Sequence, residues 1–227
     1  METANSNGWS ASNKSEVDIT SGRVAWECSF DLAEYIRTNI KAEGSVLNGQ
    51  IHQHSESLSV LELGCGRGIP SCSLLSSLQE LRFVGSISVC FQDYDQATID
   101  SVTRPAVEGH LATLSREFRS QVTVSFVVCD WMSLDYPPSS ANIILSSECV
   151  YRSDLFESHA GAIERSMRSD GVALIAAKRY YFGCGGGTID FSEYLSGSSS
   201  LHAELAEVFE NGFSNTREIL ILAFRSS

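Results

Sequence analysis

Basic residues are scarce in this chain. The 227 residues include 16 Lys and Arg against 28 Asp and Glu, which gives a formal net charge of −12 at pH 7. A nucleic-acid surface needs clustered Lys and Arg, and no such cluster occurs in the sequence. We therefore expect no direct nucleic-acid binding. An acidic protein can instead attract a basic partner.

Long apolar runs and paired cysteine motifs are also missing. No apolar run approaches the ~20 residues of a membrane-spanning helix, so no membrane association is expected. The seven cysteines form no Cys-x-x-Cys, which excludes the zinc and dithiol templates. Most of them lie inside apolar runs and are expected to be free, buried side chains in a reducing compartment. His52 and His54 make a poor metal site without further ligands, and no metal is predicted.

The first residues have the composition of a leader. Residues 1–15 are polar, rich in Ser and Asn, and lack the apolar core of a signal peptide. Such a composition is typical of disordered chain. We expect a flexible leader over 1–21 and one α/β domain over 22–227, which is long enough for a substantial core.

Short apolar runs alternate with helical patterns along most of the domain. The expected strands are 59–63, 86–91, 121–128, 141–145 and 172–177. Helices are expected through 32–40 and 70–78, from 96 toward Pro105, and over about 107–118 and 154–168, with a polar loop at 41–57. This alternation predicts an α/β fold: a Rossmann-like, doubly wound, mostly parallel sheet.

The C-terminal part has a different pattern. The glycine-dense segment 183–187 is expected to be a mobile or ligand-hugging loop. Asn211-Gly212 predicts a hairpin turn, and 218–224 after it predicts an antiparallel strand at or near the sheet edge. The pattern of 203–210 fits either a strand or a helix.

The segment 59–70, Ser-Val-Leu-Glu-Leu-Gly-Cys-Gly-Arg-Gly-Ile-Pro, joins the first strand to a helix. Gly64, Gly66 and Gly68 allow a sharp turn and a close approach of the backbone to a ligand. The following helix start points free N–H groups at the same place. The segment predicts a nucleotide-like cofactor site, and a tight turn without a ligand is the alternative.

Polar residues end the other strands too. In open parallel sheets the ligand lies beyond the carboxyl ends of the strands, so one site should gather Gln92–Tyr94, Asp130-Trp131 and Ser146–Tyr151 beside the glycines. The Gly-x-Gly-x-Gly spacing differs from the Gly-x-Gly-x-x-Gly of dinucleotide dehydrogenases. Asp93 suits a ribose diol, Asp130 an exocyclic amine and Trp131 a purine plane. The set fits S-adenosylmethionine better than NAD.

These segments resemble the seven-β-strand, class I methyltransferases, with Glu62–Gly68 similar to their motif I and with Asp93 and Asp130 similar to the acids of motifs II and III. A narrower resemblance, over about 22–224, is to the protein-histidine methyltransferases that modify a large-subunit ribosomal protein in eukaryotes. The segments that carry it are Trp26–Leu32, Phe91–Tyr94, Thr103–Pro105, Ser147–Tyr151 and Tyr181–Gly187. The resemblance implies a seven-stranded sheet, S-adenosylmethionine as cofactor, a basic protein substrate, a monomer, and a location in the cytoplasm or also the nucleus.

The resemblance also implies roles for individual residues. The expected cofactor-binding residues are Trp26, Glu27, Gly64, Gly66, Gly68, Gln92, Asp93, Tyr94, Asp130, Trp131 and Ser146. Within this set, Trp26 and Glu27 would lie at the methionine end of the cofactor, and Gln92 and Tyr94 would flank the adenine. The structural alternatives are a core position for Trp26 or Trp131, a helix start for Gly68, and a helix cap for Asp93.

Methyl transfer from a sulfonium needs alignment more than acid–base help. Neutral imidazole has a free lone pair, so the site must select one nitrogen and hold the other N–H. Glu148 and Tyr151 are the candidates for holding the ring, and 181–187 would be a gate or acceptor-binding segment. The alternative for Glu148 is a helix cap or a pair with an Arg. The rival functions are a related lysine methyltransferase and a non-catalytic cofactor-binding protein.

Overall fold

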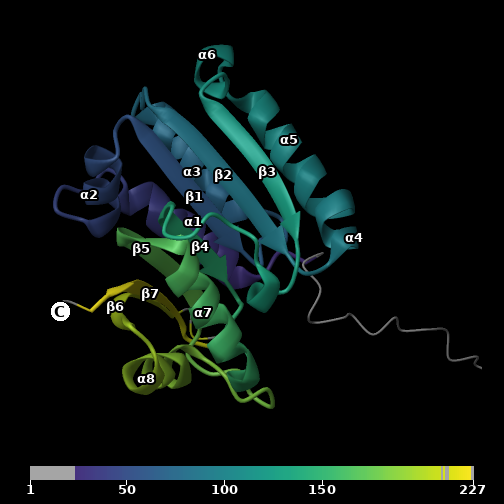
Figure 1. Ribbon diagram of the computed structural model, residues 1–227, viewed down its shortest axis with the longest axis vertical. Coiled ribbons are helices and arrows are strands. Elements are labelled where there is room, and N and C mark those ends of the chain that lie inside the picture. The colour runs from purple at the N-terminus through teal and green to yellow at the C-terminus, as the bar shows by residue number, and fades with distance from the viewer. Residues whose placement is uncertain (1–23, 211, 213–214, 226–227) are drawn as a thin grey trace, which may run out of the picture.

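The computed structural model describes residues 24–210, 212 and 215–225 (Figure 1). The expected leader and Asn211 of the expected hairpin turn lie outside these residues. Within the described ranges no helix combines the length and the apolar character needed to cross a membrane.

A seven-stranded sheet forms the centre of the domain, in the order β3-β2-β1-β4-β5-β7-β6. Its strands are β1 (Ser57–Leu63), β2 (Ser86–Asp93), β3 (Val122–Val128), β4 (Ala141–Ser147), β5 (Met167–Lys178), β6 (Leu201–Phe209) and β7 (Arg217–Phe224). The first five pair in parallel, and β7 lies antiparallel between β5 and the edge strand β6. The Rossmann-like, mostly parallel sheet with an antiparallel C-terminal strand is confirmed. The segment whose pattern fitted either a strand or a helix forms β6, which ends at Phe209.

Helices cover both faces of the sheet (Figure 1). One face packs against α1 (Glu27–Asn39), α2 (Val46–Gln53), α3 (Ile69–Glu80), α5 (Arg104–Thr113) and α6 (Arg116–Arg119). The other face packs against α7 (Phe156–Ser166) and α8 (Thr188–Ser198). Successive strand residues alternate between these two cores, as Val60 and Leu61 of β1 do.

Two helices were not expected. Residues 46–53 form α2, although 41–57 was predicted to be a loop; Ser45 caps the helix and Leu47 and Ile51 are buried. The two buried apolar residues are surrounded in the sequence mostly by polar ones, so the helical period was not recognisable. Helix α8 follows the glycine loop directly, and its Phe191 and Leu195 are fully buried beneath the sheet.

The segment around Pro105 also differs from the prediction. A short α4 (Gln96–Thr98), a π-helical segment at Ile99–Thr103 and α5 follow one another without a break. Pro105 lies in the first turn of α5, where a proline is tolerated. The single helix expected over 107–118 is interrupted at Leu114, whose backbone is extended.

Strand β5 begins earlier than predicted. Helix α7 ends at Ser166, and the strand starts at Met167 instead of 172. Asp170 and Gly171 therefore lie within the strand, at a register irregularity between the pairs Ala141–Met167 and Ile143–Val172.

Candidate active site

The turn from β1 to α3 is built on glycine. Gly64, Gly66 and Gly68 all have positive φ, between 47° and 67°. A Cβ on Gly64 would lie 2.4 Å from Cys149 Sγ, and one on Gly68 would lie 2.8 Å from the Phe91 ring. The turn thus needs glycine both for its backbone conformation and for its close packing.

Glu62, at the end of β1, fixes the start of α3. Its side chain is 1% exposed and accepts a hydrogen bond from Ser71 N at 3.0 Å. Burial raises the pKa of Glu62 to about 8, against the hydrogen bonds from Ser71 that lower it. Glu62 therefore supports the turn from behind and does not line the cavity described below.

Asp93 ends β2 and faces the glycine turn. Its Oδ2 accepts from Gly66 N at 3.1 Å, and its Oδ1 accepts from Asp95 N at 3.1 Å. Burial raises the pKa of this carboxyl, while the backbone hydrogen bonds oppose the shift. The helix-cap role that was the alternative for Asp93 belongs to Asp95, which accepts from Ala97 N and Thr98 N.

Gln92 connects three strand ends. Its Oε1 accepts from Gly64 N at 3.0 Å and from Trp131 Nε1 at 2.9 Å, and its Nε2 donates to Cys129 O at 2.7 Å. The amide is 1% exposed. Its hydrogen bonds hold the glycine turn and Trp131 in place, so Gln92 positions its neighbours in addition to contributing to the cavity wall.

Asp130 and Trp131 follow β3. Asp130 Oδ1 accepts from Met132 N at 2.9 Å and caps the short turn Trp131–Ser133. The Trp131 ring meets the fully buried His159 edge-on, with centroids 4.7 Å apart. One side of the indole is therefore fixed by Gln92 and His159, and the other side faces the cavity.

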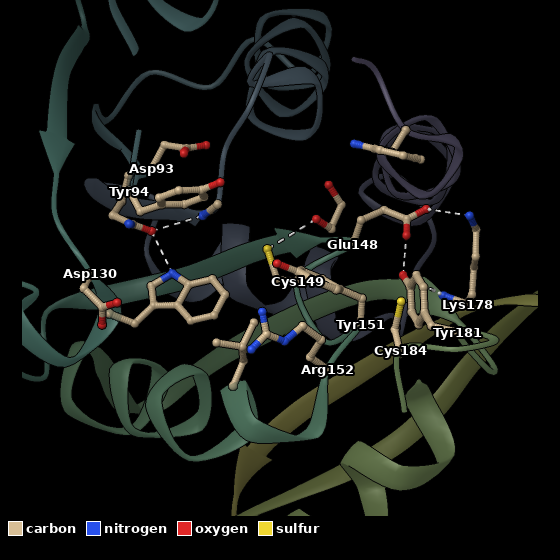
Figure 2. A pocket seen from close by; sticks show the side chains of 16 residues that line it. Asp93, Tyr94, Asp130, Glu148, Cys149, Tyr151, Arg152, Lys178, Tyr181 and Cys184 are labelled. Atoms are coloured by element: carbon tan, nitrogen blue, oxygen red, sulfur yellow. Dashed lines mark hydrogen bonds and ion pairs between the residues drawn. The ribbon is translucent and has the colours of Figure 1, made fainter. Parts of the chain in front are cut away.

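A cavity of about 500 Å³ lies at these strand ends. Figure 2 shows Asp93, Tyr94 and Asp130 on one side of it and Glu148, Lys178 and Tyr181 on the other. Its walls also include Trp26, Gly64, Gln92, Trp131, Ser147, Cys149, Tyr151, Arg152, Leu155 and Cys184. A smaller hollow of about 40 Å³ shares Trp26, Gly64 and Ser147 with it and reaches Gly66.

The donor set of the cavity fits S-adenosylmethionine. The volume is within the range of small-molecule sites, about 300–1,000 Å³. The aromatic rings of Trp26, Tyr94 and Trp131 suit a purine and a sulfonium, and the carboxylates of Asp93 and Asp130 suit a diol and an amine. The glycine backbone lies beside these rings and carboxylates, which allows the chain to approach a ligand closely.

Glu148 follows β4 in a left-handed backbone conformation, with φ 57°. Its side chain is 9% exposed and turns toward Tyr181 and Lys178. Oε2 accepts a hydrogen bond from Tyr181 OH, and Oε1 lies 3.8 Å from Lys178 Nζ. The Cys28 thiol, whose pKa burial and Glu148 raise, also faces this carboxylate. Glu148 thus forms its ion pair with a lysine, Lys178, and not with an arginine as considered above.

The loop after β5 packs on the segment that follows β4. Tyr181 N donates to Gly186 O at 2.9 Å, and Gly187 N donates to Val150 O at 3.0 Å. A Cβ on Gly186 would lie 2.4 Å from the carbonyl carbon of Tyr151, so this contact requires glycine. The rings of Tyr151 and Tyr181 are 6.3 Å apart. The loop is therefore part of the cavity wall, through Tyr181 and Cys184.

Four of the predicted residues do not line this cavity: Gly66 borders only the smaller hollow, and the other three lie elsewhere. Glu27 is exposed, with its carboxylate 3.9 Å from Arg217. Gly68 lies behind the turn, against Phe91 and Val107. Ser146 is fully buried, and its hydroxyl is 3.0 Å from Nε2 of His159, whose pKa burial lowers to about 3.

Sequence reasoning missed Lys178, Arg152 and Leu155 as wall residues. The expected fifth strand ended at 177, one residue before Lys178, and the rule that strand ends carry the site would have found it. All seven cysteines are free, as expected.

The fold and the site define a class I methyltransferase domain. The chain belongs to the lysine methyltransferase family, whose sequence profile matches residues 10–182. A relative from Dictyostelium discoideum named histidine protein methyltransferase 1 homolog is 31% identical over 88% of this chain and 56% of its own length. The chain spans about half the length of the curated relatives it matches.

Solved structures share the fold. The CMeT domain of a citrinin polyketide synthase superposes with a TM-score of 0.55 at 19% identity, over 84% of this chain and 56% of that one. A TehB-like SAM-dependent methyltransferase from Corynebacterium glutamicum gives a TM-score of 0.50 at 20% identity, over 87% of this chain and 98% of that one. At these identities the likeness concerns the fold alone.

Proposed function

We propose that this chain is an S-adenosylmethionine-dependent protein-histidine N-methyltransferase whose substrate is a basic large-subunit ribosomal protein. The observation that carries the proposal is the cavity at the strand ends, which joins a nucleoside-like half around Asp93 and Trp131 to a second half around Tyr151 and Tyr181. Relatives named histidine protein methyltransferase support the choice of acceptor. The net charge of −12 suits a basic partner.

The residues divide between holding the cofactor and holding the acceptor. Asp93, Asp130, Trp131 and the glycine backbone would hold S-adenosylmethionine, which supplies a methyl group on a sulfonium. The acceptor side must place one imidazole nitrogen in line with that methyl group. Tyr151 lies in the cavity wall, and its phenol oxygen can accept the N–H of the other nitrogen. Because imidazole is mostly neutral at pH 7, no strong base is needed.

Glu148 was a candidate for holding the acceptor ring directly, and its contacts favour an indirect role. Its carboxylate lies in the cavity wall and is engaged there by Tyr181 and Lys178. It would act by fixing these two side chains, which form the acceptor end of the wall. Glu148 is therefore a positioning residue in this proposal, and Tyr151 is the candidate to touch the ring.

A lysine acceptor is the second candidate, because the family profile carries that name. A lysine must lose its proton before it can attack, and the only carboxylate at the acceptor end of the described cavity, Glu148, is engaged by Tyr181 and Lys178. The arrangement favours an acceptor that is already neutral. We further infer that the protein acts as a monomer in the cytoplasm or the nucleus, where ribosomal proteins are made and assembled.

The test is to incubate the protein with methyl-labelled S-adenosylmethionine and proteins from eukaryotic ribosomes, and to analyse the amino acids of the labelled band. Methyl-histidine in a large-subunit protein is the expected product. Methyl-lysine would support the second candidate. Cofactor binding without any labelling would indicate a non-catalytic binding protein. Asp93→Ala and Trp131→Ala serve as controls that should lose both cofactor affinity and labelling.

A further inference from the structure

Lys178 occupies an unusual place in the cavity. It ends β5, and its side chain lies at the opposite end of the cavity from Asp93 (Figure 2). Its ammonium lies 3.8 Å from Glu148 Oε1 and 5.6 Å from the ring centroids of both Trp26 and Tyr181. Two aromatic faces and a carboxylate are the elements with which proteins bind organic ammonium ions. The chain thus contains a cation site that is filled by its own lysine.

We propose that Lys178 is a specificity-determining residue that excludes lysine as methyl acceptor. Its ammonium occupies the place that a substrate ammonium would need, so the pocket beside it accepts a neutral ring. This inference rests on the proposed function, since it concerns the choice of acceptor in the same site.

The contacts of Glu148 show that the cation site is built into the fold. The left-handed backbone of Glu148 and its hydrogen bond from Tyr181 OH fix the carboxylate. Oε1 has no hydrogen-bond partner among the described residues and faces Lys178 Nζ. Tyr181 is held in turn by Lys178 N, which donates to its hydroxyl at 3.2 Å. The negative charge is therefore directed at Lys178 and is not offered to a substrate.

The electrostatic consequence is large for a charged acceptor and small for a neutral one. A second ammonium about 6 Å from Lys178 would meet a repulsion equivalent to about 100-fold in binding, at an effective dielectric constant of about 20. The Glu148 carboxylate attracts the same ammonium and offsets part of this repulsion, so the figure of about 100-fold is the contribution of Lys178 alone. A neutral imidazole avoids the penalty, while an imidazolium would incur it.

The first experiment tests the cation site without any enzyme activity. The probe is n-butylammonium chloride, which mimics a lysine side chain, titrated into wild type, Lys178→Ala and Lys178→Arg by calorimetry. The Ala variant should bind it at least about 10-fold more tightly than wild type, because the rings and the carboxylate become available. The Arg variant retains the cation and should match wild type. Equal binding by wild type and the Ala variant would overturn the proposal.

The second experiment tests acceptor choice with Lys178→Met, which keeps most of the stem, removes the charge and leaves no hole. With methyl-labelled cofactor and eukaryotic ribosomal proteins, the ratio of methyl-lysine to methyl-histidine should rise at least about 10-fold over wild type and over Lys178→Arg. An unchanged ratio would contradict the inference. So would a loss of cofactor affinity above about 10-fold in the Met variant, because Lys178 would then be a cofactor ligand.

The proposed function and the role of Lys178 can fail separately. If wild type forms no methyl-histidine, the proposed function fails, and the butylammonium titration still decides whether Lys178 fills a cation site. If wild type forms methyl-histidine and the Lys178 variants keep its selectivity, the proposed function stands and the role of Lys178 is wrong.

Discussion

Replacing Gln92 by Leu should loosen the cavity without unfolding the domain. The substitution keeps an apolar stem of similar size and removes the amide that accepts from Gly64 N and Trp131 Nε1 and donates to Cys129 O. Each of these three groups loses its partner in a site where the amide is 1% exposed. A buried unpaired polar group costs about 1–3 kcal/mol.

We expect a total loss of about 2–5 kcal/mol in the free energy of unfolding, less than the full sum because Gly64 and Trp131 line the cavity and water can reach them. Domains are stable by about 5–15 kcal/mol, so the variant should remain folded. Freed from Gln92, Trp131 should lose its fixed orientation. Cofactor affinity should fall by about 10-fold or more, which corresponds to about 1.4 kcal/mol.

The assays are urea unfolding followed by linear extrapolation, and calorimetric titration with S-adenosylmethionine. Gln50→Leu is the matched control. Gln50 is also buried, but it makes one side-chain hydrogen bond, to Asp170 O at 2.6 Å, and its Oε1 is unpaired in the described part of the chain. The control should lose less than about 1 kcal/mol and keep its cofactor affinity. If Gln92→Leu behaves like this control in both assays, the amide does not position the site.

Three further substitutions test single groups. The pKa of Glu62 is about 8 in the folded protein and near 4.3 in the unfolded chain, so the folded state keeps a proton that the unfolded state releases. The free energy of unfolding of the wild type should therefore fall as pH rises from about 4.5 to 8, by up to about 1.4 kcal/mol per pH unit. Glu62→Gln should abolish this slope in urea unfolding, and parallel curves would contradict the assignment. His159, with a folded pKa of about 3 and an unfolded one near 6.5, should cost stability as pH falls from about 6.5 to 3; His159→Gln should remove that dependence. Tyr151→Phe should reduce turnover by about 10-fold or more at unchanged cofactor affinity, and normal turnover would exclude the hydroxyl from acceptor binding.

The nucleoside half of the cavity could be predicted from local patterns. Gly64, Asp93 and Trp131 follow apolar runs that had to be strands, and parallel strands bring their carboxyl ends to one edge. Helix α2 could not be predicted in the same way, because a short helix with only two buried apolar residues, Leu47 and Ile51, has too few apolar positions to show a period. Helix α8 was missed for a related reason: its buried Phe191 and Leu195 follow a run of glycines that gives no helical signal.

Roles within the site depended on where each oxygen and nitrogen points. Gln92 was expected to flank a cofactor base, and the fold gives its amide to Gly64, Trp131 and Cys129. Glu27 stands next to Trp26 in the chain, yet the first turn of α1 directs it toward Arg217, on a strand nearly two hundred residues away. Neighbours in sequence share a helix turn but face different sides of it.

The sequence by itself determined the alternation of the parallel strands with helices, the glycine turn and the choice of S-adenosylmethionine as the expected cofactor, because these follow from local hydrophobic period, backbone freedom and residue chemistry. Tertiary structure alone decided the end of the cavity opposite Asp93. Only the folded sheet brings together Trp26 from the N-cap of α1, Glu148 from the end of β4 and Lys178 from the end of β5. Tyr181, from the loop after β5, forms hydrogen bonds with both Glu148 and Lys178. There the Glu148 carboxylate pairs with Lys178. The sequence could not predict this pair, because it depends on the register between β4 and β5.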